Sequence, residues 1–197
     1  MRDTGQNKLF FGYYLVGAAF LAQFVAIGIY SYVLGSFMMP MIQELGWTRA
    51  EFSLTRTIGQ LVMAFVGVFV GVRGDRFGGR PIMLWGATVL CMTLIAHSFI
   101  HSLLLWWLLN GVLLTVGCAM VGNLVVNVTL SKWFVVNRGK AIAFAAMGIS
   151  FGGVVMTPLA TVLIDELGWR AAWIWLGVGP AVILYPVALF MRRAPED

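Results

Sequence analysis

Arg56 is the only charged residue between Phe52 and Val72, an apolar run long enough to cross a membrane. A guanidinium in lipid costs about 2.5–3.5 kcal/mol even on lenient scales, so we expect its side chain to face a polar cavity. Gln60 follows one helical turn later and extends the same face. The planar guanidinium fork fits a carboxylate bidentately, which predicts a binding site for a small organic anion. The alternative is an arginine that snorkels to the membrane surface and binds no ligand.

Further polar side chains recur at helical spacing inside other apolar runs. Gln23 and Tyr30 are seven residues apart, and Asn123 and Asn127 are four apart, so each pair falls on one face of a helix. We include these four residues, with the arginine–glutamine pair, as candidate anion-binding residues. Hydrogen bonds between helices that involve no ligand are the alternative for each pair.

Two other patterns match catalytic or metal-binding motifs but are interpreted differently. The stretch from Gly148 to Gly152 fits the G-x-S-x-G elbow of hydrolases, yet that elbow follows a strand, and this stretch is predicted to lie within a helix. His97 and His101 are spaced to share a metal ion, but no Asp or Glu lies near them. We expect interfacial histidines, no metal, no cofactor and no catalytic residue, and hence no enzyme.

Composition identifies the environment in which these residues must be positioned. The chain has 197 residues, of which 60% are hydrophobic and 11% charged, and its mean hydropathy is +0.90. An ordinary soluble domain is roughly 45–50% apolar and roughly 25% charged. The composition therefore excludes a soluble enzyme, a disordered chain and a disulfide scaffold. Cys91 and Cys118 lie inside apolar runs and are interpreted as small buried hydrophobic residues.

Apolar runs of spanning length predict an all-α membrane protein with six helices. We expect a single bundle over residues 1–197, arranged as two three-helix repeats in inverted orientation, whose short connections leave no room for a soluble domain. The predicted spans are residues 11–38, 48–72, 81–99, 102–131, 139–164 and 169–191.

Local signals refine the helix ends and contacts. Thr48 and Glu51 have the spacing of a capping box at the start of the second span. The motifs Gly67-x-x-x-Gly71 and Gly148-x-x-x-Gly152 are expected to allow close contacts between helices.

Lysine and arginine are distributed unequally between the two sides of the predicted bundle. Ten lie on one side: Arg2, Lys8, Arg73, Arg76, Arg80, Lys132, Arg138, Lys140, Arg192 and Arg193. The other side has Arg49 and Arg170. Because cytoplasmic loops are enriched in basic residues, both termini are expected in the cytoplasm, with the chain as a multi-pass protein of the plasma (inner) membrane. This clustering between spans also explains the net charge of +5 without nucleic-acid binding.

The connection between the second and third spans is rich in glycine and charge, which predicts a tight turn. It resembles the signature G-x-L-x-D-R-x-G-R-R of the major facilitator superfamily. Five residues match: Gly71, Asp75, Arg76, Gly78 and Arg80. Arg73 and Gly79 depart from the signature. The resemblance implies that this loop forms a cytoplasmic latch against a second six-helix bundle.

Three more stretches resemble the monocarboxylate porter and oxalate–formate antiporter branch of that family: Gly46–Glu51, Lys132–Ala141 and Gly168–Arg170. The resemblance implies the amino-terminal half of a secondary transporter, a symporter or antiporter, for a small organic anion such as a monocarboxylate or dicarboxylate. The implied partners are this anion, the lipid bilayer and a second bundle, which is either a missing C-terminal half or another chain. A fragment or truncated product is favoured over a half-size protein. The alternatives are a non-transporting membrane interaction or assembly protein and, less favoured, an intramembrane hydrolase.

Overall fold

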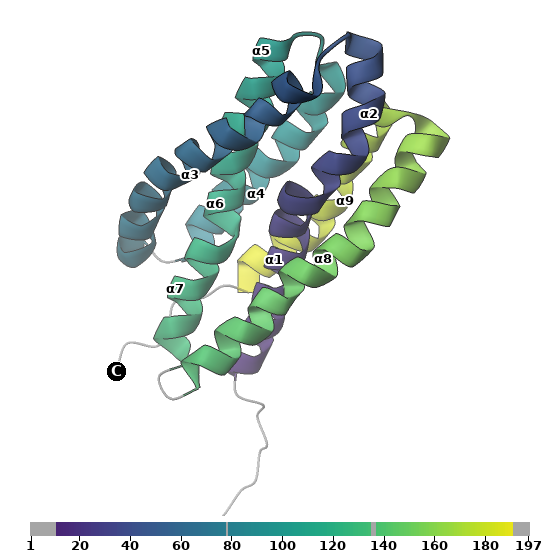
Figure 1. Cartoon of the computed structure of the whole chain (residues 1–197). Helices are drawn as coiled ribbons and strands as arrows, with labels where there is room; N and C mark the ends of the chain where they lie inside the picture. Colours follow the sequence, from purple (N-terminus) through teal and green to yellow (C-terminus); the bar gives the residue numbers. More distant parts are fainter. Residues whose placement is uncertain (1–10, 78, 135–136, 191–197) are drawn as a thin grey trace, which may run out of the picture.

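The computed structural model describes residues 11–77, 79–134 and 137–190, with the backbone alone for residues 11 and 72–77. Every regular element within these residues is helical (Figure 1). In chain order they are α1 (Phe11–Gly28), η1 (Ile29–Val33), α2 (Leu34–Leu45), α3 (Arg49–Phe77), α4 (Gly79–Ala96), η2 (His97–Phe99), α5 (Leu103–Trp106), η3 (Trp107–Leu114), α6 (Thr115–Val121), α7 (Asn123–Trp133), α8 (Arg138–Leu167) and α9 (Trp169–Phe190).

These elements form six continuous or nearly continuous spans that are long and apolar enough to cross a membrane. The first joins α1, η1 and α2 and continues through Pro40 to Leu45, beyond its predicted end at residue 38. The fourth joins α5, η3, α6 and α7. The second, fifth and sixth are the single helices α3, α8 and α9, and the third is α4 with η2. The fold is thus the expected all-α membrane bundle of six spans.

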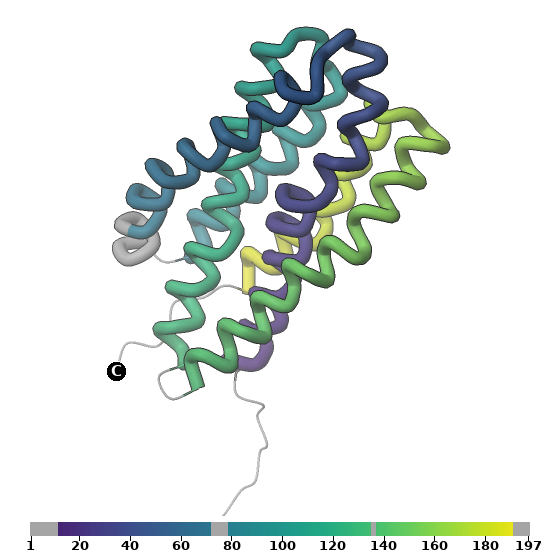
Figure 2. The backbone as a smooth tube through the Cα atoms, viewed as in Figure 1, coloured from purple at the N-terminus to yellow at the C-terminus, as the bar shows by residue number. Residues whose placement is uncertain are grey.

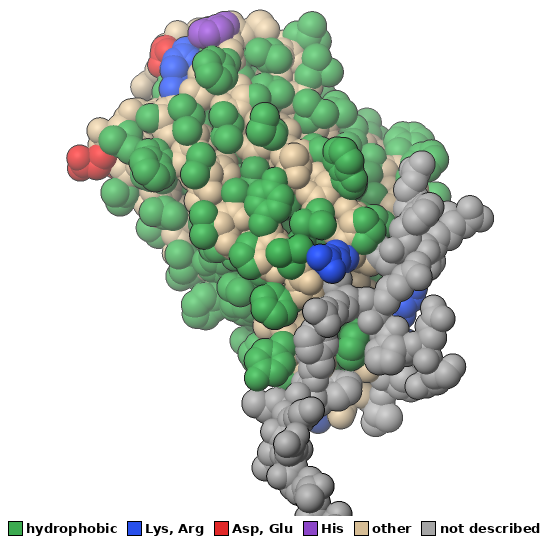
Figure 3. Space-filling model, turned by 180° about the vertical axis from the view of Figure 1, so that it is seen from behind, with side chains coloured by type: hydrophobic (Ala, Val, Ile, Leu, Met, Phe, Trp, Pro, Cys, Tyr) green, Lys and Arg blue, Asp and Glu red, His purple; other side chains and the backbone are tan. Residues whose placement is uncertain are grey.

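The chain reverses at each end of the bundle, and the charged residues differ between the two ends. We call the end with Glu44, Glu51, Asp165 and Glu166 the acidic end, and the end with Arg80, Lys132, Arg138 and Lys140 the basic end. The tube in Figure 2 shows α1 beginning and α9 ending toward the basic end, where α7 turns into α8. Seen from behind, hydrophobic side chains cover most of the molecule and acidic side chains gather at one end (Figure 3).

α3 and α8 are the least covered spans. Only 17% of the apolar window of α3 and 22% of that of α8 are buried, against 61% for the first span and 56% for the third and fourth. Large apolar side chains project from both helices, among them Leu61, Phe65, Phe151 and Val154. Each of these two helices therefore has a large apolar face that nothing in the described part of the chain covers.

Glycine allows α1 and α8 to pack with their backbones in contact. A Cβ atom on Gly28 would lie 2.8 Å from the Cα of Gly152, and one on Gly148 would overlap the carbonyl oxygen of Phe20. The predicted role of Gly148-x-x-x-Gly152 in helix packing is confirmed. For Gly67-x-x-x-Gly71 the result is different. A Cβ on Gly67 would meet the Leu124 side chain at 3.4 Å, an ordinary contact, and one on Gly71 would meet no described atom within 4 Å.

The long helices end or break at glycines with unusual backbone angles. Gly46 (φ 71°) ends the first span and Gly168 (φ 80°) ends the fifth, both in the left-handed region that favours glycine. Gly122 (ψ −145°) interrupts the fourth span between α6 and α7. These three positions explain where the spans stop or bend.

The predicted capping box at the start of α3 is confirmed. The backbone N–H and the hydroxyl of Thr48 both donate to Glu51 Oε2 at 2.8 Å, and the Glu51 N–H donates to Thr48 Oγ1 at 3.2 Å. These bonds fix the start of α3 and hence the position of Arg56 along the span.

Candidate functional site

Arg56 is half-buried and reaches from α3 to the backbone of the first span. Its Nη1 donates to the carbonyl oxygen of Tyr30 at 2.9 Å, and its Nη2 donates to that of Ser31 at 2.6 Å. The guanidinium carbon also lies 5.1 Å from the centre of the Tyr30 ring, within cation–π range. The protein therefore holds both prongs of the guanidinium fork.

The two accepting carbonyls belong to η1, a π-helical turn within the first span. In a π-helix the backbone bonds join residues five apart, and such turns interrupt the regular α-helical ladder, often at functional sites. Arg56 thus binds the first span where its hydrogen bonding changes. A guanidinium has five N–H groups, and these two bonds leave three for water or a ligand.

Three spans converge at this point. Thr115, in α6, donates its hydroxyl to the Tyr30 hydroxyl at 3.4 Å. Gly59, one turn beyond Arg56 on α3, lies against both, because an added Cβ would be 2.7 Å from the Tyr30 hydroxyl and 2.9 Å from the Thr115 Oγ1. Sequence reasoning missed Gly59 and Thr115. Their signal was weak, since a small residue or a threonine in an apolar run usually serves packing.

A buried polar chain begins at the residue before the arginine. Thr55 donates to Asn110 Oδ1 at 3.3 Å, and Asn110 Nδ2 lies 3.3 Å from His97 Nε2. His97 Nδ1 lies 2.6 Å from the carbonyl oxygen of Thr93. All four residues are buried. Asn110 belongs to η3, the second π-helical segment of the bundle.

The prediction for the histidines is corrected here. His97 is not interfacial but fully buried, whereas His101 is exposed. The Trp106 ring packs edge-on against the His97 ring, with 5.5 Å between ring centres, and the ring of Trp173, in α9, lies 4.6 Å from the His97 ring. Although His97 lies at the end of a span, the connection to α5 and the side chains of Trp106 and Trp173 cover it.

The remaining predicted binding residues lie elsewhere on the spans. Gln60 is exposed on α3, one turn from the arginine. Gln23 is fully buried, and neither its amide oxygen nor its amide nitrogen has a hydrogen-bond partner among the described residues. Asn123 is exposed at the start of α7, and Asn127 has a buried amide oxygen without such a partner. The structure thus brings Arg56 and Tyr30 into contact.

Gln23, Asn123 and Asn127 lie further toward the basic end. Gln23 precedes Tyr30 by seven residues, about 10 Å along the first span, and Asn123 follows Thr115 by eight residues, about 12 Å along the fourth. They therefore do not form a single cluster with the arginine.

The predicted latch residues follow a different backbone path from the expected turn. α3 remains helical to Phe77 and α4 begins at Gly79, so most of the predicted loop is helix. A reversal between antiparallel helices needs few residues, and helical hydrogen bonding persists until that point. The side chains of Asp75 and Arg76, and Gly78 as a whole, lie outside the described residues, while Arg80 is exposed on α4.

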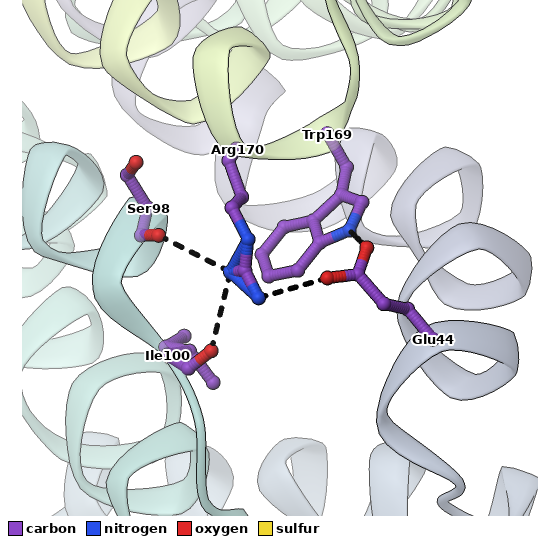
Figure 4. A network of polar contacts seen from close by, with 5 residues as sticks. All are labelled: Glu44, Ser98, Ile100, Trp169 and Arg170. Atoms are coloured by element: carbon purple, nitrogen blue, oxygen red, sulfur yellow. Dashed lines mark hydrogen bonds and ion pairs between the residues drawn. The ribbon is translucent and has the colours of Figure 1, made fainter.

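A polar cluster at the acidic end joins three parts of the chain (Figure 4). Arg170 Nη2 pairs with Glu44 Oε1 at 2.9 Å, and Trp169 Nε1 donates to Glu44 Oε2 at 2.5 Å. Arg170 also lies over the Trp169 ring at 4.1 Å and donates to the carbonyl oxygens of Ser98 and Ile100 at 3.4 and 3.5 Å. The cluster connects the end of the first span, the α4–α5 connection and the start of α9.

Comparisons with known proteins agree with this fold. The family model described as "Major Facilitator Superfamily" matches residues 19–197. A solved structure of a bacterial homologue of the human lysosomal transporter Spinster has a TM-score of 0.80 and 18% identity, covering 98% of this chain and 45% of that chain. At this identity the likeness concerns the fold alone.

Several curated relatives bear names that fit the resemblance seen in the sequence. The probable 4-methylmuconolactone transporter of Cupriavidus pinatubonensis is 30% identical over 82% of this chain and 38% of its own length. The oxalate:formate antiporter of Oxalobacter formigenes is 28% identical over 96% of this chain and 45% of its own length. Monocarboxylate transporter 4 of Mus musculus is 30% identical over 72% of this chain and 30% of its own length.

The chain thus spans less than half the length of these relatives. The match to the family model begins within the first span, at residue 19, and runs to residue 197. Six apolar spans, the helical bundle and a family model covering most of the sequence all agree. The chain belongs to the Major Facilitator Superfamily and is an integral, multi-pass membrane protein.

Proposed function

We propose that this bundle is one half of a secondary active transporter for a small organic anion, such as a monocarboxylate or dicarboxylate, with Arg56 as the anion-binding residue. A protein that moves solutes rather than an enzyme is proposed. The names of the relatives support the substrate class, since they include an oxalate:formate antiporter and a monocarboxylate transporter.

The observation that carries this proposal is a half-buried guanidinium with neutral partners. Arg56 is held by two carbonyl oxygens, which orient its fork but do not neutralise its charge. The ion pair found among the described residues joins Arg170 and Glu44 at the acidic end and does not involve Arg56. A carboxylate that replaces water on the free N–H groups would form charge-assisted hydrogen bonds with a group already fixed in place.

The proposed transport mechanism needs a second bundle. In secondary transporters, two bundles rock about a site near the middle of the membrane, and each supplies one wall. We propose that a C-terminal half or another chain covers the exposed sides of α3 and α8. Gln60 and Tyr30 would then accompany the arginine at the anion site, and Gln23, Asn123 and Asn127 would provide polar groups further along the path.

The latch and the orientation belong to the same proposal. Gly71, Asp75, Arg76, Gly78 and Arg80 would form the contact with the second bundle at the basic end. That end would face the cytoplasm with both termini, in the plasma (inner) membrane. The open space beside Gly71 supports a close approach by another helix there.

One observation favours a second candidate, a non-transporting membrane assembly protein. Because Arg56 is already bonded to two carbonyls, it could serve only to attach α3 to the first span. In that case its replacement would affect stability and no ligand.

The test is carboxylate binding and uptake by a protein that contains this bundle and a second one, reconstituted in liposomes. Labelled oxalate, formate and nicotinate serve as probes, and Arg56→Gln and Arg56→Lys are compared with the matched control Arg49→Gln at the exposed start of α3. We expect Arg56→Gln to abolish binding and Arg56→Lys, which keeps the charge but loses the fork, to weaken it about tenfold or more. Wild-type affinity in Arg56→Gln would contradict the anion site and favour the assembly role.

A further inference from the structure

Two adjacent residues of α3 hold the two π-helical segments of the bundle. Arg56 donates to the carbonyls of η1 in the first span, and Thr55 donates to the side chain of Asn110 in η3 of the fourth span. α3 therefore lies between the two irregular turns and is bonded to both. Whatever fixes Asn110 also fixes the position from which the arginine reaches η1.

The direction of every hydrogen bond on the Thr55 side follows from one carbonyl. The oxygen of Thr93 can only accept, so His97 Nδ1, 2.6 Å away, must carry a hydrogen. A neutral ring then leaves Nε2 as an acceptor, which receives a hydrogen from Asn110 Nδ2. Asn110 therefore presents its oxygen to Thr55, which matches the observed donation.

The surroundings of the histidine favour this neutral form. Its ring is fully buried, between Trp106 of α5 and Trp173 of α9. The charged groups around its neighbours are Arg170, which donates to the Ser98 and Ile100 carbonyls and is paired with Glu44, and Arg56, which follows Thr55 on α3. No described carboxylate contacts the ring, so nothing there stabilises a charged imidazole.

From these contacts we infer that His97 is a positioning residue for the proposed anion site. Through Asn110 and Thr55 it fixes α3 against η3, and thereby sets the position of the Arg56 guanidinium. This inference rests on the proposed function. It assigns a role in anion affinity to a side chain buried on a different span from the arginine and in contact with it only through two other residues.

Two amide substitutions that differ only in length distinguish this role from simple packing. Both His97→Gln and His97→Asn remove the ring and introduce an amide. The longer glutamine can place its oxygen near the position of Nε2 and accept from Asn110, whereas asparagine reaches only the position of Nδ1. We expect His97→Asn to weaken carboxylate binding about fivefold to tenfold, the effect of one lost buried hydrogen bond, and His97→Gln to retain wild-type affinity within about twofold.

Thr55, at the other end of this series of hydrogen bonds, offers a second, independent pair of variants. Thr55→Val removes the donor at nearly constant volume, and Thr55→Ser keeps it. Thr55→Val should weaken binding like His97→Asn, and the double variant should be no weaker than either single one, because both break the same chain of bonds. This pair also tests the inference if a His97 variant does not fold.

Binding is measured with the carboxylate that the wild-type, two-bundle protein retains among oxalate, formate and nicotinate. Amide hydrogen exchange without ligand is measured in parallel, and we expect faster exchange over residues 107–114 in His97→Asn but not in His97→Gln. Equal affinity and equal exchange in the two His97 variants would overturn the inference. If exchange differs as expected while Arg56→Gln binds normally, the anion site fails and the structural connection stands.

Discussion

At the scale of single residues, the bundle contains two arginines that are stabilised in different ways. Arg56, within a span, is bonded to neutral carbonyls and keeps its charge available. Arg170, at the acidic end, combines an ion pair with a ring contact and two carbonyl bonds. The first arrangement suits a ligand site, and the second suits a fixed structural connection.

The ion pair of the second arginine should contribute little by itself. The side chains of Arg170 and Glu44 are 34% and 49% exposed, and exposed pairs typically contribute about 0.2–1 kcal/mol. Glu44→Gln keeps an acceptor for Trp169 and should lower the unfolding midpoint only slightly. Arg170→Gln also loses the ring contact and both carbonyl bonds, and should lower it more.

Thermal unfolding in lipid nanodiscs at low and high salt checks this prediction. The difference between wild type and Glu44→Gln should shrink as salt increases, because screening acts on exposed charges. A larger loss in Glu44→Gln than in Arg170→Gln would show that the ion pair, rather than the ring and carbonyl contacts, holds the cluster.

At the scale of elements, close contact between α1 and α8 depends on glycines that face each other. Gly28 and Gly152 leave no space for a side chain, and the obstructing atoms are backbone, which cannot move aside. Gly152→Ala should therefore lower the free energy of unfolding by about 1–3 kcal/mol, as overpacking does in cores. Gly17→Ala on α1, where a Cβ would meet nothing within 4 Å, is the control and should stay near wild type.

Unfolding in mild detergent, followed by helical circular dichroism, measures both variants. If Gly152→Ala and Gly17→Ala were equally stable, the two helices would be able to separate without loss. In that case the close contact would not be required for the stability of the bundle.

What the sequence could predict depends on the range of the interactions. Six spans follow from local hydropathy, and the capping box at Thr48 follows from spacing within one turn. The contact of Arg56 with Tyr30 could be predicted, because a charge in an apolar run must find polar partners. The π-helical turns, the burial of His97 and the depth of Gln23 depend on how separate spans pack, and no local pattern specifies that packing.

At the scale of the whole molecule, charge is arranged by end, and this arrangement predicts the orientation in the membrane. Arg138 and Asp165, both exposed, lie at opposite ends of α8. With Arg138→Cys and Asp165→Cys, a membrane-impermeant thiol reagent applied to intact cells should label only the second. The native Cys91 and Cys118 are buried and should give little background.

Labelling after the cells are opened provides the control, since Arg138→Cys should then react. Reaction of Arg138→Cys in intact cells would place the basic end outside and reverse the proposed orientation. Reaction of both positions in intact cells would contradict the single crossing by α8.

The π-helical turn η1 has a mechanical consequence for the first span. Such a turn accommodates one residue more than an α-helical turn, and an α-helix advances by about 100° per residue. If η1 changed into a regular α-helix, α2 would rotate about its own axis relative to α1. Glu44, near the far end of α2, would then move relative to Arg170, so a change in the hydrogen bonding of η1, where Arg56 binds, would also change the polar cluster at the acidic end.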